Sequence, residues 1–173
     1  LSCIQAAEDN KMDFAFCLGG NLYGSNPDSF LTSKALSNID TMVYINTTLN
    51  TGHAWGIGKE TIILPVLARD EEYQSTTQES MFNFVRLSQG GIKRHNNLKS
   101  EVEIIGEIGR RVLGDNNLFN WSGLKNHESI RKLISKIIPG YKSIGLIGKT
   151  NKEFHIEGRI LHSPIFPTES GKA

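Results

Sequence analysis

The chain has 173 residues, of which 38% are hydrophobic, so it is long enough to bury one core and too short for two full domains. Nineteen basic and eighteen acidic residues leave a formal net charge of +1, which excludes a global field that would hold nucleic acid or an anionic membrane. Cys3 and Cys17 show no metal-binding spacing, which favours buried thiols in a reducing, cytoplasmic compartment. No apolar run approaches the roughly 20 residues that span a bilayer.

We expect the sequence, which begins without Met and stops after "TESGKA", to be a piece of a longer protein. Its first part alternates between predicted helices and strands. A short helix is predicted over residues 1–11, and another begins near Asn26 and Pro27, a capping residue followed by a proline suited to the first helical position. Strands are predicted over residues 14–18, 41–45 and 61–65. This alternation predicts an α/β fold with a Rossmann-like, open and mostly parallel sheet flanked by helices.

The second part of the chain carries one predicted strand and two amphipathic helices. Residues 81–87 alternate at period two and predict an edge strand. Helices are predicted over residues 100–114 and 127–140. In the first of them, Ser100 and Glu103 have the spacing of a capping box. Its predicted apolar face is formed by Val102, Ile105, Ile108 and Val112. The sequence from Tyr141 onward indicates a linker or a segment that needs a neighbour.

The glycine-rich stretch after the first strand is similar to the dinucleotide fingerprint G-x-G-x-x-G. Gly19, Gly20 and Gly24 surround Asn21, which stands at the middle glycine of that pattern. The fingerprint also requires an acidic residue at the end of the second strand, where this chain has Asn46. Ordinary nicotinamide binding is therefore disfavoured, and glycines that serve only a tight turn remain an alternative.

Three other features of the sequence bear on possible sites. Residues 143–150, "SIGLIGKT", match the second half of a P-loop, but no buried strand precedes them, so a flexible surface loop is predicted. His53 lies in the long polar loop of residues 46–58. It is expected either to contact a ligand or to form hydrogen bonds within the loop. Glu71 and Glu72 are compatible with a solvated turn.

The ends of the three predicted parallel strands should meet at one edge of the sheet, where ligands bind in this fold class. The segments delivered there are residues 19–26, 46–53 and 65–72. They are rich in amides, hydroxyls and backbone donors, which suit a nucleotide better than a metal ion.

Four stretches resemble, in order, the molybdopterin oxidoreductase family, and within it the formate dehydrogenase-like alpha subunits: "LGGNLYGSNPD", "VYINTTLNTGHAWGIGKETIILPVLARDE", "QESMFNFVRLSQGG" and "LKSEVEIIGEIGRRVLG". The resemblance covers residues 1–114. The closing "SPIFPTESGKA" resembles the junction that leads into the family's C-terminal cofactor-binding domain.

The resemblance implies a cofactor-binding domain of the formate dehydrogenase/DMSO reductase type. Residues 1–114 would cradle a molybdopterin guanine dinucleotide that carries molybdenum or tungsten, and residues 115–173 would be a helical extension and linker. A 4Fe–4S cluster would lie upstream of this chain. The full-length protein would be an oxidoreductase, while this fragment, with no catalytic or metal-ligating residue, would be inactive alone. Its partners would be the remaining domains of its own polypeptide and a small-molecule substrate, with no nucleic acid or membrane.

The cofactor contacts that the resemblance implies fall at strand ends and at one helix start. They are Gly20, Asn21, Asn46, Thr47, Thr48, Asn50, Thr51, Glu71 and Glu101. Asn46 replaces the Ser or Gln often found in the family, which keeps donor and acceptor capacity at that position. Two alternatives stay open: a stand-alone nucleotide-binding module of the NAD type without redox chemistry, and a structural domain that binds no small molecule.

Overall fold

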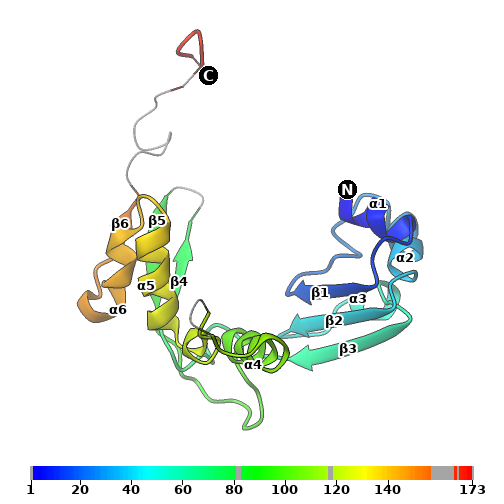
Figure 1. Cartoon of the computed structure of the whole chain (residues 1–173), viewed down its shortest axis with the longest axis horizontal. Helices are drawn as coiled ribbons and strands as arrows, with labels where there is room; N and C mark the ends of the chain where they lie inside the picture. Colours follow the sequence, from blue (N-terminus) through cyan, green and yellow to red (C-terminus); the bar gives the residue numbers. More distant parts are fainter. Residues whose placement is uncertain (1, 81–82, 117–118, 157–165, 167, 173) are drawn as a thin grey trace. The chain divides into compact units, whose positions relative to one another are not determined.

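The structure is a computed structural model that describes residues 2–80, 83–116, 119–156, 166 and 168–172 (Figure 1). The chain divides into two compact units, Leu1–Leu67 and Ala68–Ala173. This division precedes the boundary expected at residue 114. The assignment of residues 1–114 and 115–173 to a cofactor domain and an extension stays a prediction.

The first unit is an α/β layer built on a three-stranded parallel sheet in the order β1-β2-β3. Its elements are α1 (Ser2–Glu8), β1 (Phe14–Leu18), α2 (Ser29–Leu36), β2 (Thr41–Asn46), α3 (Gly52–Trp55) and β3 (Glu60–Pro65). Phe16, Val43 and Ile62 lie side by side across the three strands. The predicted fold class is confirmed, because the strands are parallel and helices flank the sheet.

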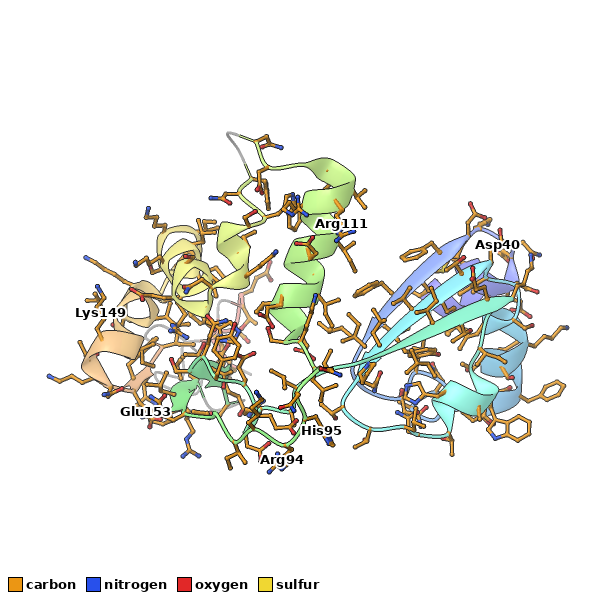
Figure 2. All side chains as sticks on the ribbon, turned by 90° about the horizontal axis from the view of Figure 1, so that it is seen from below. Asp40, Arg94, His95, Arg111, Lys149 and Glu153 are labelled. Carbon is orange, nitrogen blue, oxygen red and sulfur yellow. The ribbon has the colours of Figure 1, made fainter. Side chains whose placement is uncertain are left out.

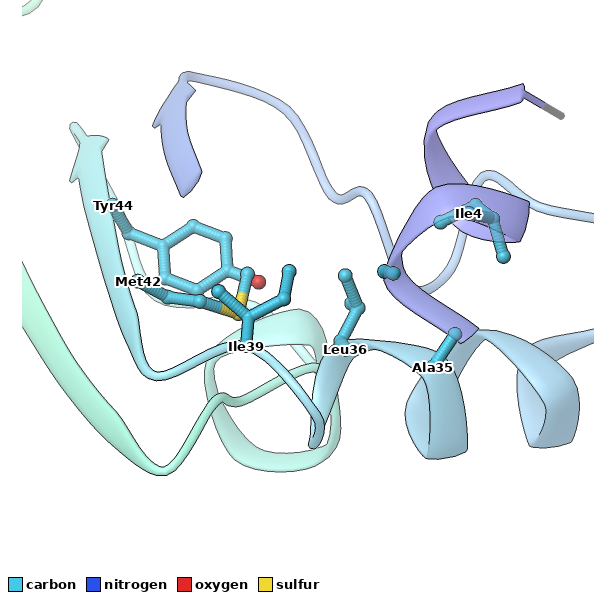
Figure 3. Packing of buried hydrophobic residues seen from close by; sticks show 7 residues of the cluster. Ile4, Ala35, Leu36, Ile39, Met42 and Tyr44 are labelled. Atoms are coloured by element: carbon cyan, nitrogen blue, oxygen red, sulfur yellow. The ribbon is translucent and has the colours of Figure 1, made fainter. Parts of the chain in front are cut away.

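The core of the first unit lies between the sheet and helices α1 and α2. Met42 and Tyr44 point from β2 toward Leu36 and Ile39, which lie at the end of α2 and just beyond it (Figure 3). Ile4 of α1 completes this apolar cluster. Alternate residues of β2 thus form one buried layer, as the period of two in a strand requires.

The start of α2 differs from the sequence-based expectation. Asp28, rather than Asn26, is the N-cap, and its Oδ1 accepts a hydrogen bond from the backbone N–H of Leu31 at 2.8 Å. Asn26 instead donates to the carbonyl of Leu22. Both are capping residue types, so the sequence pattern alone did not distinguish them.

The second unit combines an antiparallel sheet, in the order β4-β5-β6, with short helices. Its elements are β4 (Thr76–Glu79), β5 (Phe84–Ser88), α4 (Glu101–Leu113), η1 (Gly123–Lys125), α5 (His127–Ile137), η2 (Lys142–Gly145), α6 (Ile147–Thr150) and β6 (Phe154–His155). The expectation of an edge strand is wrong, because β5 pairs with a neighbour on each side.

Of the two predictions for the sequence from Tyr141 onward, a linker is wrong for residues 141–156 and a segment that needs a neighbour is confirmed there. Tyr141, Ile144, Ile147 and Ile156 are buried together with Val85 of β5 and form the core of the second unit. The prediction of a flexible loop at residues 143–150 is wrong for the same reason, since this segment supplies part of the core through η2 and α6.

Helix α4 begins as predicted and packs differently. Ser100 and Glu103 form the predicted capping box. Ile108 and Val112, however, are exposed, and the buried residues of α4 are Gly106 and Gly109. The side of the helix that carries these two glycines is the one in contact with the chain around Trp121.

Of the closing motif of residues 163–173, residues 163–165, 167 and 173 lie outside the described residues. In the part of the chain that the structure describes, no helix is both long and apolar enough to cross a membrane.

Candidate functional site

The carboxyl ends of β1 and β2 lead into two loops that touch each other. The backbone N–H of Gly19 still donates to the carbonyl of Ile45 at 2.8 Å, so the loops begin as a continuation of the sheet. Gly19 and Gly20 then adopt φ values of 68° and 73°, which residues with a Cβ atom rarely adopt. A Cβ placed on either residue would meet no atom within 4 Å. The backbone here is therefore open to close approach by a ligand.

Two asparagine side chains hold the carbonyl of Gly20. Nδ2 of Asn46 donates to it at 3.2 Å, and Nδ2 of Asn50 donates at 2.9 Å. The Asn50 side chain also accepts a hydrogen bond from the N–H of Gly52 through Oδ1. Residues that are 26 and 30 positions apart are thus joined at one oxygen atom, as the strand-end argument predicts.

Asn21 joins the same two loops from the other side. Its Oδ1 accepts from the N–H of Gly24 at 2.8 Å, and its Nδ2 donates to Oγ1 of Thr51 at 2.9 Å. A Cβ on Gly24 or Gly52 would lie 2.6 or 2.5 Å from this amide. Asn21 therefore fills the space between the loops where the dinucleotide fingerprint has a glycine.

We call Gly20, Asn21, Asn46, Asn50 and Thr51 the rim. The hydrogen bonds bring these five predicted site residues together, and their contact with a cofactor stays a prediction. Asn46 contains an unusual atom of the rim: the residue is only 9% exposed, and its buried Oδ1 has no hydrogen-bond partner among the described residues. Buried acceptors are nearly always paired in proteins, so this oxygen lacks the donor that such a position normally has.

Behind the rim, His53 and Tyr44 support the loop. Nδ1 of His53 accepts a hydrogen bond from the N–H of Asn50 at 2.9 Å, so the proton of a neutral ring is on Nε2, which is buried and has no partner in the part of the chain that the structure describes. The ring meets Tyr44 edge-on, with centroids 4.9 Å apart. The Tyr44 hydroxyl donates to the carbonyl of Gly56, and burial raises its pKa to about 12, with the Cys17 thiol adding to the shift.

The remaining predicted residues are placed differently. Thr47 and Thr48 are exposed beyond the end of β2. Glu71 and Glu101 belong to the second unit, where Glu101 is exposed at the first turn of α4. Glu71 and Glu72 are buried, so the interpretation as a solvated turn is wrong.

The buried acid Glu71 closes a turn of the second unit. Its Oε2 accepts from the N–H of Ala68 at 2.8 Å, and its Oε1 lies 3.6 Å from Nη1 of Arg94. Arg94, labelled in Figure 2, also forms an ion pair with Asp70 that lowers the pKa of that carboxyl group. These contacts give Glu71 a structural role in the turn.

Tyr44 was the residue of this region that the sequence analysis did not predict. The sequence pattern could have indicated it, because Tyr44 and Asn46 lie two positions apart on one strand and so share a face of the sheet. Across the described ranges, no group of three or more His, Cys, Asp and Glu side chains is arranged to hold a metal ion.

Comparison with known proteins identifies distant relatives of this chain. No protein-family model matches the chain. Proteins named "uncharacterized oxidoreductase" in Mycobacterium tuberculosis and Mycobacterium bovis are 26% identical over the whole chain. The chain is a distant relative of oxidoreductases. It is also 27% identical, over 82% of its length, to protein YdeP of Escherichia coli K12. It spans only 23% and 19% of the length of these relatives.

Proposed function

We propose that this chain is the cofactor-cradling part of a molybdopterin-dependent oxidoreductase of the formate dehydrogenase-like type. The similarity to proteins named oxidoreductases supports redox chemistry in general. The finer assignment rests on the family resemblance of the rim and on one observation, the buried and unpartnered Oδ1 of Asn46.

The rim has the donor and acceptor set that a purine nucleotide tail requires. Oδ1 of Asn46 would accept from a base or ribose donor, and the unobstructed backbone at Gly19 and Gly20 would let a phosphate approach. Asn21 and Asn50, whose amides already join the loops, would keep these groups in place. Asn46 and Gly20 would therefore bind the nucleotide tail. Asn21 and Asn50 would hold the two loops in the orientation that this binding requires.

The bound molybdenum or tungsten pterin would supply the electron transfer itself. This chain would contribute binding and orientation, since Oδ1 of Asn46 is fixed by the hydrogen bond that Nδ2 of the same side chain makes to Gly20.

The test compares the cofactor content of the full-length protein with that of two variants. We expect Asn46→Ala to lose most of its bound metal and pterin, measured by elemental analysis and by fluorescence of the released pterin. Loss of one buried hydrogen-bonding group costs about 1–3 kcal/mol, or roughly 5- to 150-fold in affinity.

The matched control is Asn38→Ala. Asn38 lies in the same unit and also uses its amide to bind backbone carbonyls, those of Ala7 and Glu8, away from the rim. The Asn38→Ala variant should retain the cofactor. Equal cofactor content in the two variants would refute the site. A wild-type protein that contains no pterin, and binds NAD or no nucleotide, would refute the function.

A further inference from the structure

His53 is the single histidine of residues 1–67, and its ring is tied into one of the two loops that form the rim. Its Nδ1 accepts a hydrogen bond from the backbone N–H of Asn50 at 2.9 Å, and its own backbone N–H donates to the Asn50 carbonyl at 3.1 Å. Oδ1 of Asn50 accepts from the N–H of Gly52 at 2.8 Å. Asn50 and His53, three positions apart, thus close a turn in a manner similar to a capping box.

This closed turn determines where the Asn50 side chain points. Because its Oδ1 is already bonded within the turn, Nδ2 of Asn50 is directed to the carbonyl of Gly20, where it donates at 2.9 Å beside the bond from Asn46. The His53 ring is held in turn by its edge-on contact with Tyr44. The contact between the two loops therefore depends on the atom that accepts the Asn50 N–H.

The turn requires a neutral His53. A neutral ring with its proton on Nε2 presents a lone pair at Nδ1, whereas a protonated ring carries a hydrogen on both nitrogens. A proton on Nδ1 would face the N–H of Asn50 across 2.9 Å, so that two donors would oppose each other. The hydrogen on Nε2 lies at a buried position without a partner among the described residues. Protonation would therefore break the turn and place a positive charge on a ring that lacks an acceptor for either N–H.

The neighbours of the ring stay uncharged near neutral pH. Burial raises the pKa of Tyr44 on β2 to about 12, and it also raises the pKa of the Cys17 thiol, which lies opposite Tyr44 on β1. The contacts of this loop and α3 to the first loop and to α2, through Asn21 and Ser33, are made by an amide and a hydroxyl. None of the ion pairs formed among the described residues includes His53. Histidine is the side chain that ordinarily changes its charge between about pH 5 and 8.

We propose that His53 is a positioning residue of the rim, which holds Asn50 against Gly20 while it is neutral and releases this loop when it is protonated. The rim should therefore bind its ligand less tightly in mild acid than at neutral pH. Release of the loop follows from the hydrogen bonds of this chain alone, whereas the effect on ligand binding rests on the proposed function.

Hydrogen–deuterium exchange of the complete gene product, followed by mass spectrometry, tests the release of the loop. Peptides that cover residues 46–53 are compared at about pH 5.5 and about pH 7.5, on either side of the usual histidine titration, after correction for the intrinsic exchange rate. We expect the corrected exchange to be at least about fivefold faster at the lower pH, because opening of the loop exposes its amides. Equal corrected exchange at the two pH values would overturn the proposal.

Two amide variants separate the lost acceptor from general effects of acid. His53→Asn places an amide oxygen near the position of Nδ1 and does not titrate, so its loop should exchange slowly at both pH values. His53→Gln extends its amide toward the position of Nε2 and leaves the Asn50 N–H without an acceptor, so its loop should exchange fast at both. His95→Asn, at an exposed position of the second unit, should behave like wild type. A pH difference as large in His53→Asn as in wild type would overturn the assignment to His53.

The pterin content of the same proteins, after dialysis at the two pH values, tests the effect on binding. Wild-type protein should retain at least about fivefold less pterin at the lower pH, and His53→Asn should retain equal amounts at both. Equal retention by wild type would overturn the effect on binding. Wild-type protein that contains no pterin at either pH would refute the proposed function, and the exchange measurement would still decide the role of His53.

Discussion

At the scale of single residues, Asn21 shows how a side chain at a glycine position of the fingerprint changes the loop. The dinucleotide fingerprint uses the middle glycine to let a ligand approach, whereas here the Asn21 amide occupies the space between Gly24 and Gly52. Both ends of the amide are hydrogen-bonded, Nδ2 to Thr51 of the rim and Oδ1 to the N–H of Gly24. The substitution was visible in the sequence, but the bonds that it makes depend on loops 30 residues apart.

We predict that Gly52→Ala destabilises the first unit by about 1–3 kcal/mol, the usual cost of overpacking. The added Cβ would lie 2.5 Å from Oδ1 of Asn21 and 3.0 Å from Oδ1 of Asn50. Thermal unfolding of the variant provides the measurement. In the Asn21→Ala background the added cost should fall below about 1 kcal/mol, because the main clash is gone. Equal costs in the two backgrounds would show that the amide does not fill this space.

Tyr44 leads to a prediction about alkaline pH. Its pKa is raised to about 12 in the folded protein, chiefly by burial, whereas an unfolded tyrosine titrates near about 10. The folded state therefore keeps a proton that the unfolded state loses, and the free energy of unfolding should decrease as pH rises from about 10 to about 12. Urea unfolding at a series of pH values measures this slope.

Tyr44→Phe should remove that contribution to the slope. It should also lower stability at neutral pH by about 1–2 kcal/mol, because the carbonyl of Gly56 loses its donor. Tyr23→Phe is the control, since Tyr23 is a partly exposed tyrosine of the same unit. Parallel stability curves for wild type and Tyr44→Phe between pH 10 and 12 would contradict the assignment.

At the scale of elements, α4 separates what a sequence pattern determines from what packing determines. The capping box of Ser100 and Glu103 is a local device, and it was predicted correctly. The buried side of α4 was predicted incorrectly. The apolar residues at helical spacing predicted that Ile108 would be buried, whereas the structure buries Gly106 and Gly109. The ring of Trp121 requires a surface without side chains, and that requirement lies outside the helix.

Gly109→Ala should therefore destabilise the second unit. Alanine is favoured over glycine in a helix interior by about 1 kcal/mol, but its Cβ would lie 2.4 Å from the Trp121 ring. Phe119 stacks on that ring with centroids 5.1 Å apart, so the ring is not free to move away. We expect a net loss of about 1–3 kcal/mol in denaturant unfolding.

The same substitution in a Trp121→Ala background tests the cause. There the clash is absent, so Gly109→Ala should stabilise the protein by helix propensity alone. Arg111→Ala, at an exposed position of α4, controls for general effects on the helix. A loss of stability that is the same with and without Trp121 would assign the effect to the backbone instead.

At the scale of the whole molecule, the parallel sheet was predictable and the second core was not. The three parallel strands are predicted by short apolar runs that are followed by glycine, asparagine or proline. The five rim residues that are joined by hydrogen bonds follow from the rule that parallel strands end together. In contrast, the second core is formed by residues at irregular spacing: Tyr141, Ile144 and Ile147 lie in or next to short helical turns, and Ile156 follows a two-residue strand.

The order of the two units along the chain has a consequence for biosynthesis. All pairings of β1, β2 and β3 lie within Leu1–Leu67, so the parallel sheet can assemble at the ribosome once this segment has emerged. Translation of the rest then takes several seconds at about 5–20 residues per second. During that interval Phe14 and Phe16 of β1, which are exposed in the structure, should be accessible to chaperones that bind apolar side chains.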